Sequence, residues 1–172
     1  MKTQLLSGVL VSIAILTGPF AYCNNAKPAN TLTREIALKS AFQKITLESG
    51  MELVLVQEAN RSTILITGDE NLLQSVNVSI DKDVLSITSK KNLRNKKIKI
   101  YVPVTTLSLL DLGSYTSVTT EGLVKLKGLK VLVHEGTKVA LNILGDFHIE
   151  SADECDFVYE KYEVAKVVYI TQ

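Results

Sequence analysis

Apolar side chains recur at every second position along much of this chain, and that spacing limits what it can fold into. Successive side chains of an extended strand point to opposite faces of a sheet, so a period of two indicates a strand with one buried face. No long window carries an apolar stripe at the 3.6-residue period of a helix. The spacing therefore predicts an all-β fold. The alternating sets are Ile45 and Leu47; Leu53 and Leu55; Ile64 and Ile66; Val76, Val78 and Ile80; Leu85 and Ile87; and Ile98, Ile100 and Val102.

Short polar segments separate these sets. They are rich in glycine, asparagine, aspartate and serine, which favour turns or tolerate left-handed backbone. We therefore expect antiparallel hairpins across residues 42–105. The segments are Ser49-Gly50, Asn60-Arg61, residues 68–71, residues 81–83 and residues 92–95.

Residues 107–158 repeat a different unit. A short apolar strand, a bend of small or polar residues and a second short strand begin at Leu107, Leu129 and Phe147, so the starts are 22 and 18 residues apart. Periods of this length are typical of stacked coils in a β-solenoid or β-helix. The alignment predicts two inward columns, one of Thr116, Thr137 and Cys155, and one of Val118, Val139 and Phe157. Residues 164–170 are expected to form a terminal capping strand whose edge could also serve assembly.

The N-terminus has the pattern of a secretory signal peptide. Lys2 precedes an uncharged apolar run from Leu5 to Leu16, which is short for a membrane span and meets the pair Gly18-Pro19. We expect residues 1–23 to be removed after Cys23, with cleavage after Ala21 or Ala26 as alternatives. Lipidation of Cys23 is a further alternative, but Tyr22 fills a position that normally holds a small residue.

The rest of the chain then divides into a tether over residues 24–41 and a single domain over residues 42–172. Two cysteines cannot build a disulfide framework, and Cys155 has no partner once Cys23 is removed. A buried core thiol is the simplest role for Cys155.

The charges are balanced overall but segregated. The chain has 19 Lys and Arg against 18 Asp and Glu, so no global field draws it to nucleic acid or to acidic membranes. One acid-free segment is nevertheless strongly basic and is expected at a hairpin tip. It is the candidate contact for a polyanion, although a merely solvated loop is the commoner outcome. No aromatic residue is interleaved before Tyr101, so nucleic acid is not expected. Its cations are Lys90, Lys91, Arg94, Lys96, Lys97 and Lys99.

No motif in the sequence indicates catalysis, a cofactor or a metal. Asp146, His148 and Glu150 share one strand face and His134 belongs to the adjacent coil, but this spacing is a weak match to any metal site. Neither a phosphate loop nor a nucleophile elbow is present. The remaining candidates are a nucleophile set of Ser151, His134 and Asp153 and a carboxylate set of Asp153, Glu154 and Asp156, both in a charge-rich context. We expect a protein that is not an enzyme.

Several of these segments resemble the head GIN domain family, described as heads of auto-transporter adhesins in bacterial envelope and secreted proteins. The name motif survives only as its glycine, in Gly50-Met51-Glu52. The resemblance implies an exported β-solenoid-like domain, and adhesion by architecture alone. Its carriers are residues 42–45, 53–57, 64–69, 84–87 and 98–103, together with the Leu-rich coil starts.

Three functions remain open. The first is an adhesin-like binding module of the periplasm, outer-membrane surface or secreted space, with an anionic glycan, lipid or envelope protein as partner. The second is an envelope structural or assembly protein whose strand edges pair with copies of itself or with a larger partner. The third is a glycan-active enzyme. A shallow aromatic or polar groove on one sheet would favour the first, an open edge the second and a carboxylate cleft the third.

Overall fold

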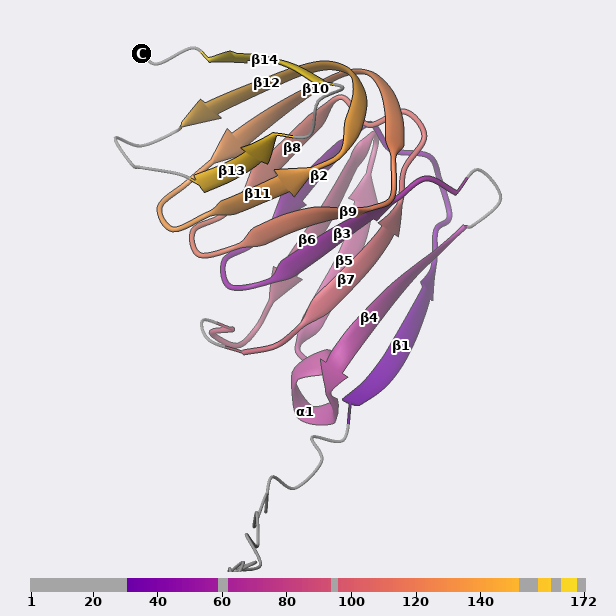
Figure 1. Ribbon diagram of the computed structural model, residues 1–172. Helices are drawn as coiled ribbons and strands as arrows, with labels where there is room; N and C mark the ends of the chain where they lie inside the picture. The colour runs from indigo at the N-terminus through magenta and orange to yellow at the C-terminus, as the bar shows by residue number, and fades with distance from the viewer. Residues whose placement is uncertain (1–30, 59–61, 94–95, 152–157, 162–164, 170–172) are drawn as a thin grey trace, which may run out of the picture.

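The computed structural model describes residues 31–58, 62–93, 96–151, 158–161 and 165–169, which are almost entirely β (Figure 1). This confirms the prediction of an all-β fold. Two seven-stranded mixed sheets are present, and one short helix, α1 (Glu70–Leu73), follows β4.

Sheet A contains seven strands, in the spatial order β1 (Thr31–Ala37), β4 (Thr63–Asp69), β7 (Lys99–Pro103), β3 (Glu52–Val56), β9 (Ser117–Glu121), β11 (Lys138–Leu141) and β13 (Val158–Lys161). Sheet B follows the order β14 (Ala165–Tyr169), β12 (Ile143–Ser151), β10 (Val124–Val133), β8 (Leu109–Leu112), β2 (Lys44–Leu47), β6 (Val84–Ser89) and β5 (Val76–Asp81).

One apolar core lies between the two sheets. The side chains predicted to alternate inward do so: Ile45 and Leu85 of sheet B and Ile100 of sheet A are completely buried. The buried cluster continues through β8, β10 and β12 to Ile149. Burial of these apolar side chains determines which face each strand turns inward.

From β8 onward the chain alternates between the sheets. Strands β8, β10, β12 and β14 run parallel to one another in sheet B, while β9, β11 and β13 run parallel in sheet A. Strands β2 and β3 join the same parallel ladders through β8 and β9. The predicted series of antiparallel hairpins over residues 42–105 is therefore wrong apart from β5 and β6, because β2 and β3 lie in different sheets.

The predicted alignment of the repeats is correct in part. Val118 pairs with Val139, and Thr116 and Thr137 are both buried, with their hydroxyls donating to the carbonyl of Gly113 at 2.8 and 3.3 Å. In the first repeat, however, Val131 pairs with Leu110 and not with Leu109.

The third repeat is aligned as predicted at its first strand, where Leu129 pairs with Phe147 and Val131 with Ile149, but not at its second. Val139 pairs with Tyr159 of β13, whereas the sequence pattern placed Phe157 there. A strand with two apolar residues on one face fits its neighbour in more than one register, since a two-residue slip keeps the same face buried. Cys155 and Phe157 lie outside the described residues.

Part of the segment predicted to be a tether forms β1, which pairs antiparallel with β4 along its whole length. This strand is mostly exposed, so apolar burial was a poor signal for it. Arg34 connects β1 to α1 and β5, because its guanidinium donates to the backbone carbonyls of Leu73 at 3.1 Å and Val76 at 2.9 Å. The segment predicted as a signal peptide lies outside the described residues.

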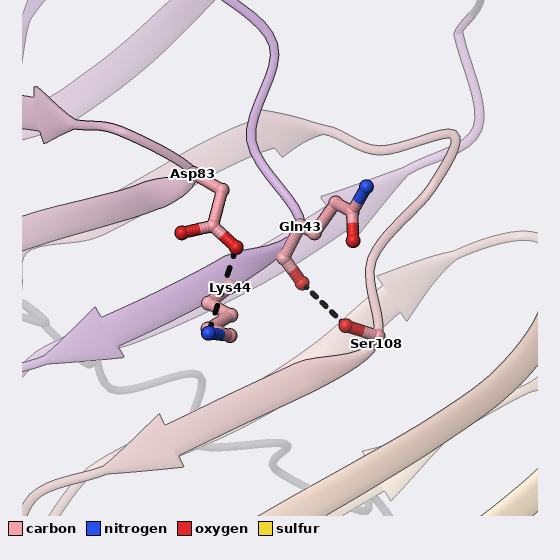
Figure 2. A network of polar contacts seen from close by, with 4 residues as sticks. All are labelled: Gln43, Lys44, Asp83 and Ser108. Atoms are coloured by element: carbon pink, nitrogen blue, oxygen red, sulfur yellow. Dashed lines mark hydrogen bonds and ion pairs between the residues drawn. The ribbon is translucent and has the colours of Figure 1, made fainter.

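A polar network fixes the start of β2 against its neighbours on both sides (Figure 2). The Lys44 ammonium lies 3.5 Å from the carboxylate of Asp83, at the turn between β5 and β6. On the other side, the Ser108 hydroxyl and amide donate to the carbonyl of Gln43 at 3.1 and 2.8 Å. These bonds connect the start of β2 to the residues that precede β6 and β8.

Candidate ligand-binding site

The outer face of sheet A carries a hollow of about 880 Å³ near the start of β3 and β7 and the end of β4. Its polar lining side chains alternate along these strands with the fully buried Leu53, Ile66 and Ile100, so they point away from the core. The volume falls within the range of ~300–1,000 Å³ found for small-ligand sites. The lining residues are Thr31, Glu52, Thr67, Gly68, Asp69, Leu72, Lys96, Lys97, Lys99 and Tyr101.

Three strands that are distant in sequence build the floor of this hollow. Register places Thr67 of β4 beside Lys99 of β7, and Lys99 beside Glu52 of β3. Tyr101 follows two positions further along β7, on the same face. Because the strands are paired by backbone hydrogen bonds, these side chains start from a rigid surface.

Charges of both signs meet on that floor. The Lys99 ammonium lies 3.0 Å from Oε1 of Glu52, and the hydrogen bond to this carboxylate raises the pKa of Lys99 above its ordinary value. The hydroxyl of Thr67 donates to the backbone carbonyl of Lys99 at 3.3 Å. Lys96 and Lys97 are exposed at the rim, so the three lysines exceed the carboxylates of Glu52 and Asp69.

The basic segment is a crossover between the sheets, and the predicted hairpin tip is wrong. It leaves β6 in sheet B and enters β7 in sheet A, with Leu93 and Ile98 each only 1% exposed. Leu93 within the basic run and Ile98 just before Lys99 anchor the segment to the core. Lys90 and Lys91 therefore follow β6 of sheet B, whereas Lys96 and Lys97 lead into β7 of sheet A.

The structure brings together half of the predicted polyanion contact. Lys96, Lys97 and Lys99 line the hollow. Lys90 and Lys91 do not: the Lys91 ammonium donates to the carbonyl of Asn71 at 3.1 Å, and Lys90 is exposed next to it. Arg94 lies outside the described residues.

Asp146, His148 and Glu150 alternate along one face of β12 as predicted, and Ser151 pairs with Val133, the residue before His134. His134 follows β10 and has its Nδ1 2.9 Å from the carbonyl of Leu112, whereas His148 lies on β12 opposite Lys130. Glu150 forms an ion pair of 2.7 Å with that same lysine. In the part of the chain that the structure describes, no three His, Cys, Asp or Glu side chains are grouped to hold a metal. Asp153, Glu154 and Asp156 lie outside it.

Sequence reasoning did not identify Glu52, Thr67 and Tyr101 as parts of one site. Tyr101 was visible as the first aromatic residue after the basic segment. Nothing in the sequence indicated that β3 and β7 lie side by side in parallel, and that pairing is what brings Glu52 to Lys99.

Within the described residues, none of the helical structure is long and apolar enough to cross a membrane.

No curated protein matches the chain. Among solved structures, it is similar to one described as a "putative adhesin" from Parabacteroides distasonis, with 14% identity, a TM-score of 0.56, and coverage of 84% of this chain and 71% of the other. It is also similar to one described as a "putative lipid binding protein" from the same organism, with 19% identity, a TM-score of 0.57, and coverage of 81% and 61%. The chain thus spans less than two thirds of that second protein. At these identities the likeness concerns the fold.

The family comparison is more specific. Residues 41–154 match the family described as "Putative auto-transporter adhesin, head GIN domain". The match covers most of the strands that the structure describes, including β3, β4 and β7. The chain therefore belongs to the head GIN domain family, as the resemblance of its strand segments indicated.

Proposed function

We propose that this protein is a non-enzymatic, adhesin-like binding module that holds an anionic ligand in the hollow on sheet A. The observation that carries the proposal is the convergence of Lys96, Lys97 and Lys99 with Tyr101 on one concave surface. A concave surface with clustered cations concentrates anions locally even when the whole protein is nearly neutral. The names of the family and of the structural relatives agree with a binding role.

The finer architecture and location are part of the same proposal. The alternation of β8 to β14 between two parallel ladders is typical of stacked coils, which supports a β-solenoid-like body. The signal pattern of residues 1–23 supports export to the periplasm, the outer-membrane surface or the medium. Intact-mass spectrometry of the cell-envelope and secreted fractions tests this, because a protein that begins at Asn24 without lipid is expected.

The polyanion site is tested by charge removal on one side of the crossover only. The double substitution K96Q/K97Q should weaken binding to anionic glycans or vesicles and reduce the dependence of affinity on salt, since exposed charges are screened over about 10 Å at 0.1 M. The double substitution K90Q/K91Q is the matched control, because it removes the same charge from the same segment at two side chains that do not line the hollow. Binding is measured by isothermal titration calorimetry over a range of salt concentrations.

Equal losses in both double variants would indicate a non-specific charge effect and contradict the proposed site. The melting temperatures should change little in either variant, because all four side chains are exposed.

Assembly through strand edges is a second candidate function. Strands β1 and β5 end the two sheets on one side and have no further strand beside them among the described residues. Unpaired edges are templates for another strand. Analytical ultracentrifugation tests this, with a concentration-dependent oligomer as the expected result and a monomer at all concentrations as the contrary one.

A further inference from the structure

An apolar row crosses the outer face of sheet A at Tyr101. Leu65 of β4 pairs directly with Tyr101, and Tyr101 pairs directly with Val54 of β3, so the three side chains lie side by side on one face. Val54 is only 6% exposed, while Leu65 and Tyr101 are half-buried. Tyr101 is the member of this row that lines the hollow. An aromatic ring supported by two aliphatic neighbours is a flat, rigid contact surface.

The polar part of the hollow offers hydrogen-bond donors and acceptors together. Lysine ammonium groups only donate, and the carboxylates of Glu52 and Asp69 only accept when ionised. A ligand that contacts both the lysines and the carboxylates must accept hydrogen bonds at one position and donate them at another. The phosphodiester group of a phospholipid such as phosphatidylglycerol accepts but does not donate, whereas a sugar hydroxyl does both.

The apolar lining is too small for a lipid tail. Among the described residues that line this hollow, Leu72 has the only purely aliphatic side chain and Tyr101 the only aromatic ring. Each CH₂ of an acyl chain that is removed from water stabilises a complex by about 0.8 kcal/mol. An acyl chain therefore needs a continuous apolar wall along its length. The apolar face of one sugar ring needs only a surface the size of Tyr101.

We infer that the ligand of this hollow is an acidic saccharide, with one sugar ring packed on Tyr101, its carboxylate beside Lys97 and Lys99, and its hydroxyls donating to Glu52 or Asp69. The inference rests on the proposed function, because it names the ligand class of that same site. It gives a role to the lining carboxylates, of which Asp69 is the one not already in an ion pair with Lys99.

The test measures, in the full chain, how much the Tyr101 ring and the lysine charges each contribute to saccharide affinity. The probes are three carboxylated saccharides (an oligogalacturonate, a hyaluronan oligosaccharide and sialyllactose), the methyl ester of the oligogalacturonate, and vesicles of phosphatidylglycerol in phosphatidylcholine. At least one carboxylated saccharide should bind. Tyr101→Ala should weaken its binding about tenfold, as loss of a central aromatic contact does, while Tyr101→Phe should stay within about twofold. Circular dichroism and thermal melting establish that both variants are folded.

Two further results are expected with a binding oligogalacturonate. Its methyl ester should bind more weakly, because esterification removes the carboxylate and keeps the ring, and K96Q/K97Q should weaken the acid more than the ester. A carboxylated saccharide that binds equally well to Tyr101→Ala would overturn the ring contact.

Vesicles separate this inference from the proposal on which it rests. Vesicle binding that depends on Lys96 and Lys97, without binding of any carboxylated saccharide, would overturn the saccharide inference and leave an anion site in place. Absence of lysine-dependent binding to every probe would overturn both.

Discussion

At the scale of single residues, Gly145 has no room for a side chain. It lies in β12 with a φ of +143°, and a Cβ placed on it would collide with the carbonyl oxygen of Leu126 on β10. The backbone of β10 shifts register against β12 between Lys125 and Gly128, which brings that carbonyl close. We expect Gly145→Ala to lower the free energy of unfolding by more than about 3 kcal/mol, because backbone must move to make room. Urea denaturation measures this loss.

Gly122 provides the matched control for that substitution. Its φ is +73°, but nothing lies within 4 Å of the position that its Cβ would occupy. Gly122→Ala should therefore cost only the strain of left-handed backbone, about 1–2 kcal/mol. Equal losses at the two glycines would show that the contact with Leu126 is not the cause.

At the scale of elements, the sequence was sufficient to place many strands but not their partners. Alternation identified β2, β3 and β4 from Ile45, Leu53 and Ile64, each of which is completely buried. A period of two states which face is buried and contains no information about the neighbouring strand. Parallel pairing of β3 with β7, and with it the meeting of Glu52 and Lys99, therefore required the structure.

Strand β8 shows the same limit within one element. Leu107, Leu109, Leu110 and Leu112 contain two alternating sets, and the sequence pattern selected Leu107 with Leu109. In the structure Leu110 and Leu112 are completely buried and Leu109 is half-exposed. A change of parity between Leu107 and Leu110 cannot be read from hydrophobicity, because all four residues are leucine.

This register gives a direct prediction for β8. Leu110→Ala should destabilise the protein by about 2–5 kcal/mol, the usual cost of a cavity at a buried leucine. Leu109→Ala removes the same atoms from the outer face and should cost less than about 1 kcal/mol. Chemical denaturation of the two variants in parallel measures the difference. The reverse order would restore the register that the sequence pattern suggested.

At the scale of the whole molecule, one core joins the two sheets. Buried side chains of β4 and β7 in sheet A belong to the same cluster as those of β6 and β12 in sheet B. The hollow on sheet A depends on this shared core, because β3, β4 and β7 expose Glu52, Thr67 and Tyr101 only while their opposite faces stay buried. Ligand binding at the hollow should therefore be lost in the same transition in which the domain unfolds.

We accordingly expect one cooperative unfolding transition for the domain. Leu110→Ala in sheet B and Val118→Ala in sheet A both open cavities in the shared cluster, so each should lower the midpoint without splitting the transition. Far-ultraviolet circular dichroism reports both sheets, and tyrosine fluorescence includes Tyr101 at the hollow. Coincident curves from the two probes are the expected result in both variants. Two separate transitions in either variant would show that the strands around the hollow form a unit of their own, which a single shared core does not allow.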